Sequence, residues 1–292
     1  MRAVHAGALA VLDEAIGNIS SAIIAAGLWE DTLIFFSSDN GGPLGSEGDG
    51  TMASNFPFRG GKHTLYEGGV RAEAFAWGPK WFGAPGGNAI WGGLAHVSDV
   101  GLTILDAAGV APLPPRPGRE LHGVSFWGPL TAGAPANRSH VVVNIDYTTA
   151  NGDSAQLENY AQAALVAANG WKLLLGNPAF PELDYWSDRN GERGPPPGPS
   201  SVPLAPSRSA GEAAPSPLWP LANMTPSLYN LTADPREAAN VAGDHPDVVA
   251  EMLQVLAAWG VRAVPVVENN TVDPQSNPGK YFNGSWTPWL GL

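Results

Sequence analysis

Apolar side chains recur at helical spacing near the start of the chain. Leu12, Ile16, Ile19 and Ile23 fall three or four residues apart between about residues 4 and 26, and Gly27 ends the pattern. This spacing puts the four side chains on one face of a helix. The pattern therefore predicts an amphipathic helix.

A short, continuous apolar run with β-branched and aromatic side chains follows at residues 32–38. Such a run predicts a strand buried on both faces in a parallel sheet. Residues 39–55 are rich in Gly, Ser and Asp, which predicts a loop at the carboxyl end of that strand, where open α/β sheets bind ligands. A further strand is predicted at 71–77. A helix is predicted from 96 to 108, with Ser98 or Asp99 as its cap.

The second half has a different pattern. Pro and Gly accumulate at 111–118 and 128–137, which places a domain boundary near residue 135. Beyond it, 140–146 and 163–175 read as strands, with a hairpin around Asn169 and Gly170. A short strand at 227–231 and a helix at 245–259 follow. Residues 194–220 are rich in proline and predict a long surface loop.

The predicted fold class is therefore α/β. Residues 1–135 form the distal part of an α/β/α sandwich, and residues 136–292 form a smaller α+β domain with an antiparallel sheet and one long helix.

The amino-acid composition limits the kinds of molecule that the chain is expected to bind. The 292 residues carry a formal net charge of −12, which argues against binding to nucleic acid or to an anionic membrane. The pattern also shows no apolar run approaching the roughly 20 residues that span a bilayer. The sequence has no cysteine, so it offers no disulfide, thiolate metal site or cysteine nucleophile.

Six Asn-x-Ser/Thr sequences would accept glycans in a secretory compartment. They begin at Asn18, Asn137, Asn223, Asn230, Asn269 and Asn283. They predict a secreted or lysosome-like location if a longer parent protein carries a signal peptide.

The first candidate site follows the strand at 32–38. Asp39 and Asn40 supply two hard oxygen ligands, and Gly41 and Gly42 let the backbone bend tightly around a cation such as calcium or magnesium. The same sequence is also compatible with a plain turn at a strand end.

A second candidate site lies some twenty residues further on. Between Arg59 and Arg71, two glycine pairs flank Lys62, so backbone N–H groups and cations could hold a tetrahedral anion. A glycine-rich surface loop with solvated charges is the alternative. Arg59 and Arg71 are interpreted as structural residues, with Glu67 as a possible ion-pair partner.

Together these motifs resemble the catalytic domain of type I sulfatases, of the arylsulfatase B kind and within the alkaline phosphatase-like superfamily. The matching segments are Leu12–Asn18, Gly27–Trp29, Phe36–Gly42, Pro57–Lys62 and Tyr66–Arg71, with weaker matches as far as Trp286–Trp289. The resemblance implies that the chain is the C-terminal portion of such an enzyme and that the whole enzyme hydrolyses aryl or sugar sulfate esters.

The resemblance also implies roles for individual residues. The positions matching Asp39 and Asn40 bind one calcium ion, and the lysine matching Lys62 contacts sulfate and takes part in catalysis. His63 is a further candidate for contacting the sulfate group, whereas the other histidines are interpreted as structural. The expected partner is a sulfated small molecule or a sulfated glycan.

One part of the family pattern is missing. The family's nucleophile is a formylglycine made from a cysteine in a C-x-P-x-R segment, and this sequence contains neither. The chain alone is therefore expected to be inactive. Two alternatives are a non-catalytic relative that binds sulfated glycan or a partner protein, and a phosphodiesterase of the same superfamily.

Overall fold

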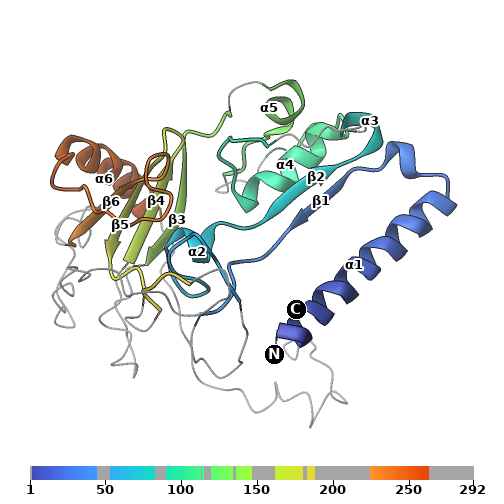
Figure 1. The fold of residues 1–292 in the computed structure, drawn as a ribbon. Coiled ribbons are helices and arrows are strands. Elements are labelled where there is room, and N and C mark those ends of the chain that lie inside the picture. Colours follow the sequence, from blue (N-terminus) through green and yellow to red (C-terminus); the bar gives the residue numbers. More distant parts are fainter. Residues whose placement is uncertain are drawn as a thin grey trace, which may run out of the picture.

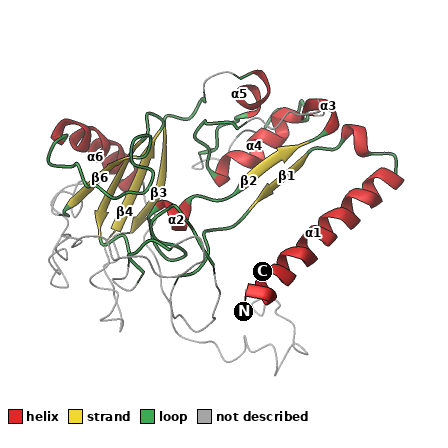
Figure 2. Ribbon diagram, viewed as in Figure 1, coloured by secondary structure: helices red, strands yellow, loops and turns green. Residues whose placement is uncertain are grey.

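The computed structural model describes residues 2–44, 53–82, 90–112, 114, 120–133, 136–146, 162–179, 183–187 and 224–262. Its elements form a four-stranded sheet with a helix on one face, a two-stranded ribbon beside it, and a long N-terminal helix set apart from both (Figure 1). Loops connect most of these elements (Figure 2).

The first helix, α1, spans Arg2–Ala25, which confirms the predicted helix. No described side chain of α1 is buried: within the predicted stripe, Leu12 and Ile19 are exposed, and Ile16 and Ile23 are half-buried. Residues Ala3–Ala25 are long and apolar enough to cross a membrane by length and composition alone. This corrects the sequence-based expectation: Asp13 and Glu14 interrupt the apolar run, but alanines keep the average hydropathy of the helix high.

The predicted parallel strand is wrong in its pairing. Strand β1 (Ile34–Ser37) pairs antiparallel with β2 (Ala74–Trp77) in a two-stranded ribbon. No residue of either strand is buried. A parallel partner for β1 does not occur among the described residues, so the described part shows a ribbon where a sandwich was expected.

Four short or medium helices follow in the first half of the chain. They are α2 (Glu67–Val70), α3 (Pro79–Phe82), α4 (Val97–Ala107) and α5 (Trp127–Ala132), and the 3-10 turn η1 (Trp29–Asp31) precedes β1. The cap of α4 differs from the prediction: His96 is the N-cap residue and its ring accepts from the Ser98 amide, while the Asp99 carboxylate accepts from the His96 amide.

The four-stranded sheet confirms the predicted antiparallel arrangement. Its order is β3 (His140–Asp146), β4 (Gln162–Ala167), β5 (Trp171–Gly176) and β6 (Pro226–Asn230), each antiparallel to the next. Gly170 has a φ of 90° in the turn between β4 and β5, a conformation that glycine adopts without the steric cost of a side chain. The predicted hairpin is therefore present.

Both faces of this sheet are covered. On one face, Leu165, Leu173 and Leu228 pack against Met252 and Leu256 of α6 (Pro246–Gly260), the predicted C-terminal helix. On the other face, Ala164, Leu174 and Tyr229 pack against Tyr66. Because side chains alternate along a strand, β5 serves both cores, and Tyr66 brings the first half of the chain onto the sheet.

Several predicted features lie outside the described residues. They are the proline-rich loop at 194–220, the C-terminal tail, and part of the boundary near residue 135.

Candidate functional site

The first candidate segment begins where β1 ends. The Asp39 carboxylate accepts a hydrogen bond from the Asn40 amide at 2.8 Å, and the Asn40 side chain donates to the Gly41 carbonyl at 2.8 Å. Asp39 is exposed and Asn40 is half-buried. The two side chains therefore lie in one tight turn, with the carboxylate open to solvent.

The second segment places Lys62 directly on this turn. The Lys62 amide donates to the Gly42 carbonyl at 3.1 Å. The Thr64 hydroxyl donates to the Gly61 carbonyl at 2.8 Å, and Gly60 has a φ of 71°. The Lys62 side chain is exposed. The backbone thus brings an exposed lysine beside the segment that carries Asp39 and Asn40.

A third segment, at the start of α2, locks the other two together. The Gly41 amide donates to the Gly69 carbonyl at 3.0 Å, and the Gly68 amide donates to the Arg59 carbonyl at 2.8 Å. A Cβ atom on Gly41 would lie 1.7 Å from the Gly68 oxygen, and one on Gly68 would lie 2.2 Å from the Gly60 oxygen. Only glycine permits this approach, because any side chain would overlap a backbone oxygen.

Beneath these loops lies a buried charge cluster that the sequence analysis did not identify. The Lys172 ammonium, with no exposed surface, is 2.9 Å from a carboxylate oxygen of Glu67 and 2.9 Å from Oε1 of Glu237. The other Glu237 oxygen accepts from the Glu67 amide at 2.7 Å. Oε1 of Glu237 meets Lys172 as an ion-pair partner without a well-directed hydrogen bond.

Burial and charge oppose one another in this cluster. Burial by itself lowers the pKa of Lys172, but the two carboxylates outweigh it and raise that pKa above its usual value. Burial raises the pKa of Glu237, and the Lys172 charge offsets this only in part. The cluster ties α2, and hence the Lys62 loop, to β5 of the four-stranded sheet.

The remaining basic residues confirm the structural interpretation given to them. Arg59 is buried: its Nε lies 2.6 Å from Asp184, and its guanidinium stacks 4.1 Å from the centre of the Tyr66 ring. Arg71 lies 3.6 Å from Glu67, one helical turn away.

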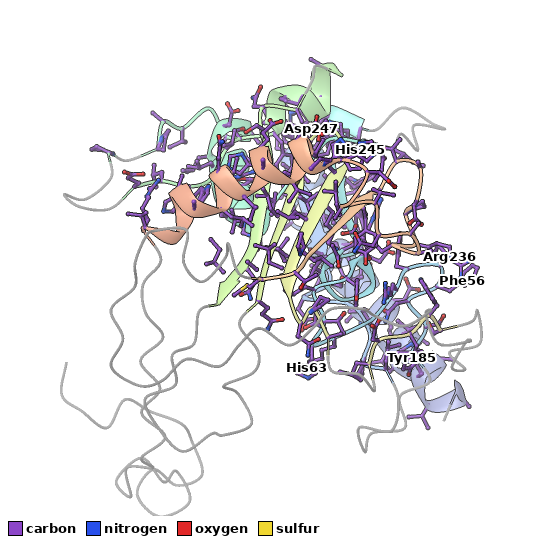
Figure 3. All side chains as sticks on the ribbon, turned by 90° about the vertical axis from the view of Figure 1, so that its left-hand side faces the viewer. Phe56, His63, Tyr185, Arg236, His245 and Asp247 are labelled. Carbon is purple, nitrogen blue, oxygen red and sulfur yellow. The ribbon has the colours of Figure 1, made fainter. Side chains whose placement is uncertain are left out.

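His63 lies at the tip of its loop. It is exposed and has a φ of 72°, an uncommon conformation for a residue with a side chain. Figure 3 shows His63 well below His245 and Asp247, which lie at the start of α6. It is thus adjacent in sequence to Lys62 and remote from the helical face of the sheet.

A calcium ion would find suitable donors here, but few of them. Asp39 and Asn40 offer the hard oxygen atoms that calcium prefers, and calcium usually takes six to eight oxygens. Within the ranges that the structure describes, no group of three or more His, Cys, Asp or Glu side chains is placed to hold a metal. The two residues fit calcium in donor type and could form only part of its coordination shell.

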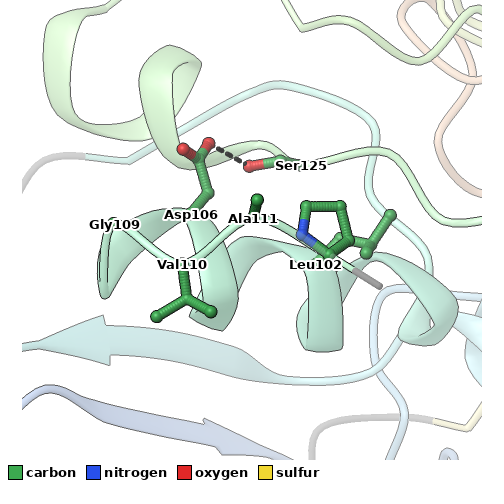
Figure 4. Close-up of a pocket in the computed structure, with 7 residues that line it drawn as sticks. Leu102, Asp106, Gly109, Val110, Ala111 and Ser125 are labelled. Atoms are coloured by element: carbon green, nitrogen blue, oxygen red, sulfur yellow. Dashed lines mark hydrogen bonds between the residues drawn. The ribbon is translucent and has the colours of Figure 1, made fainter. Parts of the chain in front are cut away.

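A cavity in the described part of the chain lies elsewhere. It has a volume of about 390 Å³ and is lined at the end of α4 by residues that include Leu102, Asp106, Val110 and Ser125 (Figure 4). The Ser125 hydroxyl donates to the Asp106 carboxylate at 2.6 Å. None of the candidate site residues lines this cavity, so it gives no support to the candidate site.

Comparison with known proteins identifies similar chains. Residues 1–110 match the family model described as Sulfatase. The chain is 32% identical to arylsulfatase J of Mus musculus over 300 residues, which cover 98% of this chain and 44% of that protein. It is 35% identical to N-acetylgalactosamine-6-sulfatase of Mus musculus over 112 residues, which cover 38% of this chain and 21% of that protein.

A solved structure has a similar fold. The PsFucS1 sulfatase from Pseudoalteromonas sp. superimposes with a TM-score of 0.55 and 22% identity, over 89% of this chain and 44% of that one. At this identity the likeness concerns the fold alone. The chain thus spans less than half the length of the relatives it matches.

Proposed function

We propose that this chain, which matches the sulfatase family model over residues 1–110 and is 32% identical to arylsulfatase J, belongs to the sulfatase family and contributes the sulfate-binding part of a sulfuric ester hydrolase that acts on aryl or sugar sulfate esters. The names of its relatives support a sulfated substrate. The likeness to arylsulfatase B in particular, and the assignment to the C-terminal portion of the enzyme, remain predictions from the sequence.

One observation carries the proposal. The Lys62 amide donates a hydrogen bond to the Gly42 carbonyl, which fixes the backbone of Lys62 next to the turn of Asp39 and Asn40. The side chain of Lys62, with its ammonium group, is exposed there. A lysine at this place would pair with sulfate oxygens and stabilise the negative charge that develops as the sulfur–oxygen bond breaks. His63, the next residue, would approach the same sulfate from the loop tip.

Asp39 and Asn40 would supply two oxygen ligands to a calcium ion, whose chemical contribution would be to polarise the sulfate oxygens. The nucleophile has a different origin. The 292 residues contain no cysteine from which a formylglycine could form. Hydrolysis by the family mechanism would need a polypeptide segment beyond these residues.

The lack of cysteine also supports a second candidate function. A relative without its nucleophile could bind a sulfated glycan or a partner protein without turnover. The two functions share the Lys62 surface and differ only in whether the ester is cleaved.

Calorimetric titration of the full chain with 4-nitrophenyl sulfate and with N-acetylgalactosamine 6-sulfate tests the proposal. We expect binding that weakens about tenfold in Lys62→Gln, since one charge-assisted contact is lost. Lys80→Gln is the matched control, because Lys80 is an exposed lysine paired with Asp31. Sulfate release, measured on the same samples, distinguishes an enzyme from a binding protein. Absence of binding to both esters would overturn the proposal.

A further inference from the structure

The half-buried side chain of Asn55 joins the two candidate segments. Its Oδ1 accepts from the Gly42 amide at 2.8 Å, and its Nδ2 donates to the Gly42 carbonyl at 2.8 Å. The same Nδ2 donates to the Gly60 carbonyl at 3.1 Å. One amide side chain thus holds both backbone groups of Gly42 and reaches across to the loop that carries Lys62.

The hydrogen-bond partners of Asn55 determine which type of side chain can occupy this position. Gly42 presents an N–H, which needs an acceptor, and two carbonyls need two donor hydrogens. A primary amide supplies one acceptor oxygen and two donor hydrogens on one nitrogen. An aspartate at this position has the same shape, but it would point a carboxylate oxygen at two carbonyl oxygens.

Asn55 and Lys62 donate hydrogen bonds to the same acceptor. The Gly42 carbonyl accepts from both the Asn55 side chain and the Lys62 amide. The space between them is full, since a Cβ on Gly61 would lie 2.4 Å from the Gly42 oxygen and 2.7 Å from Nδ2 of Asn55. The position of Lys62 therefore depends on the position of Asn55.

Asn55 itself is anchored on the side away from Lys62. Its amide donates to the Ser187 hydroxyl at 3.1 Å, and its carbonyl accepts from the Phe58 amide at 2.8 Å. Ser187 is buried. The backbone of Asn55 is thus held from a distant part of the sequence, while its side chain is directed at the Gly42 turn.

We propose that Asn55 is a positioning residue that fixes Lys62 against the Asp39–Asn40 turn and thereby sets the affinity of this surface for a sulfate ester. The affinity part rests on the function proposed above. The geometric part does not, because it concerns only how two loops of this chain are joined. In enzymes, a displacement of about 1 Å in a positioned group can lower the reaction rate by about two orders of magnitude, so a residue that fixes the position of Lys62 should have a measurable effect.

Two variants of the full chain test the inference. Asn55→Asp keeps the shape and removes both donor hydrogens, and Asn55→Ser removes them without adding charge. Asn18→Asp is the matched control, because Asn18 is exposed on α1. Hydrogen-exchange mass spectrometry follows the peptide containing Lys62, with the β4–β5 peptides as a measure of the overall fold. Calorimetry with 4-nitrophenyl sulfate measures affinity.

In both Asn55 variants, we expect the amide hydrogens of the Lys62 peptide to exchange about tenfold faster and the ester to bind about tenfold more weakly. The protection of the β4–β5 peptides should be unchanged. In a Lys62→Gln background, Asn55→Ser should cost little further affinity, because the positioned group is already gone. A residue that merely stabilised the fold would lower the affinity by the same factor in both backgrounds.

The outcomes separate the two proposals. If the unaltered chain binds no sulfate ester, the proposed function fails and the exchange data alone decide whether Asn55 holds the two loops together.

If the Asn55 variants show the same exchange rates and affinity as Asn18→Asp, the inference is overturned even though the ester binds. Weakening in Asn55→Asp but not in Asn55→Ser would show a charge effect and also overturn it. Loss of β4–β5 protection in both variants would make Asn55 a general fold residue, with the same consequence.

Discussion

At the scale of single residues, the stability of the described structure depends on buried charged side chains that form ion pairs. Asp99, 1% exposed, accepts two hydrogen bonds from the Arg138 guanidinium, with Nε at 2.7 Å from Oδ2. It also accepts from the amides of His96 and Val124, both at 2.8 Å. Asp99 lies on α4 and Arg138 lies just before β3, so this pair joins the two halves of the chain.

Replacing Asp99 by Asn should lower the free energy of unfolding by about 3–5 kcal/mol at pH 7, because the Arg138 charge is left without its partner. Burial by itself raises the pKa of Asp99, but Arg138 and the amide donors outweigh it and hold the pKa below its usual value. Because the folded-state pKa is the lower one, the stabilisation exists above a pH of about 4 and is lost as the pH falls through the folded-state pKa.

Urea unfolding of the unaltered chain and of Asp99→Asn, from pH 7 down to pH 3, checks this prediction. The difference between them should be largest at pH 7 and should shrink below about pH 4. Asp244→Asn, at an exposed position, serves as the control and should change little at any pH. A difference that stays constant with pH would contradict the role given to the Asp99 charge.

At the scale of elements, the candidate site consists of three loops interlocked through glycine. Gly41, Gly61 and Gly68 each stand where a Cβ would lie within 2.4 Å of a backbone oxygen of a neighbouring loop. The loops owe their mutual position to these close approaches and to the backbone hydrogen bonds that they allow. Secondary structure contributes little, since α2 is the only helix there among the described residues and has four residues.

Gly41→Ala should therefore destabilise the chain by at least about 1–3 kcal/mol and displace the Asp39–Asn40 turn, because its Cβ would lie 1.7 Å from the Gly68 oxygen. Gly101→Ala is a matched control inside α4, where nothing lies within 4 Å of an added Cβ. That variant should gain about 0.5–1 kcal/mol through helix propensity. Urea denaturation measures both, and equal effects would refute the close-packing argument.

At the scale of the whole molecule, α1 presents an uncovered apolar face. The helix lies apart from the four-stranded sheet and is joined to the rest of the chain at η1 (Figure 1), and Val4, Leu9, Leu12 and Ile19 are 75%, 54%, 43% and 60% exposed. Apolar side chains exposed together along one helix promote association in water. The chain by itself should therefore self-associate.

Sedimentation velocity over a range of protein concentrations checks this expectation. The unaltered chain should show concentration-dependent association, and Leu9→Lys combined with Ile19→Lys should shift it towards monomer. Asn18→Lys combined with Ser21→Lys adds the same charge at two exposed polar positions of α1 and should have a smaller effect. A chain that stays monomeric at every concentration would contradict the prediction.

The sequence predicted the local elements well, for reasons visible in particular residues. Leu165 and Leu173 show the apolar patterning of strands that face a core, and the Asn169–Gly170 pair marks the turn between them. The proximity of Lys62 to the Asp39 turn was predictable only through the family resemblance. Asn55, by contrast, stands in a segment whose polar composition looks like any loop.

The pairing of charges and strands was not predictable from local pattern. Lys172 is a buried polar residue within an otherwise apolar strand, and its partners Glu67 and Glu237 lie more than sixty residues away on either side. The apolar run at β1 suggested burial on both faces, but burial depends on what packs against a strand. In the described structure, only β2 pairs with β1.

The sequence by itself determined which segments become helix, strand or turn, because periodicity, β-branching and glycine act over a few neighbouring residues. It also determined the chemical groups available: a carboxylate, an amide and an ammonium group, and no thiol. Only the tertiary structure decided that Asn55 joins the Asp39 and Lys62 loops, that Lys172 is buried between two glutamates, and that the apolar face of α1 stays exposed. These outcomes depend on contacts between residues far apart in the chain, whose energies exist only once the loops and sheets are packed together.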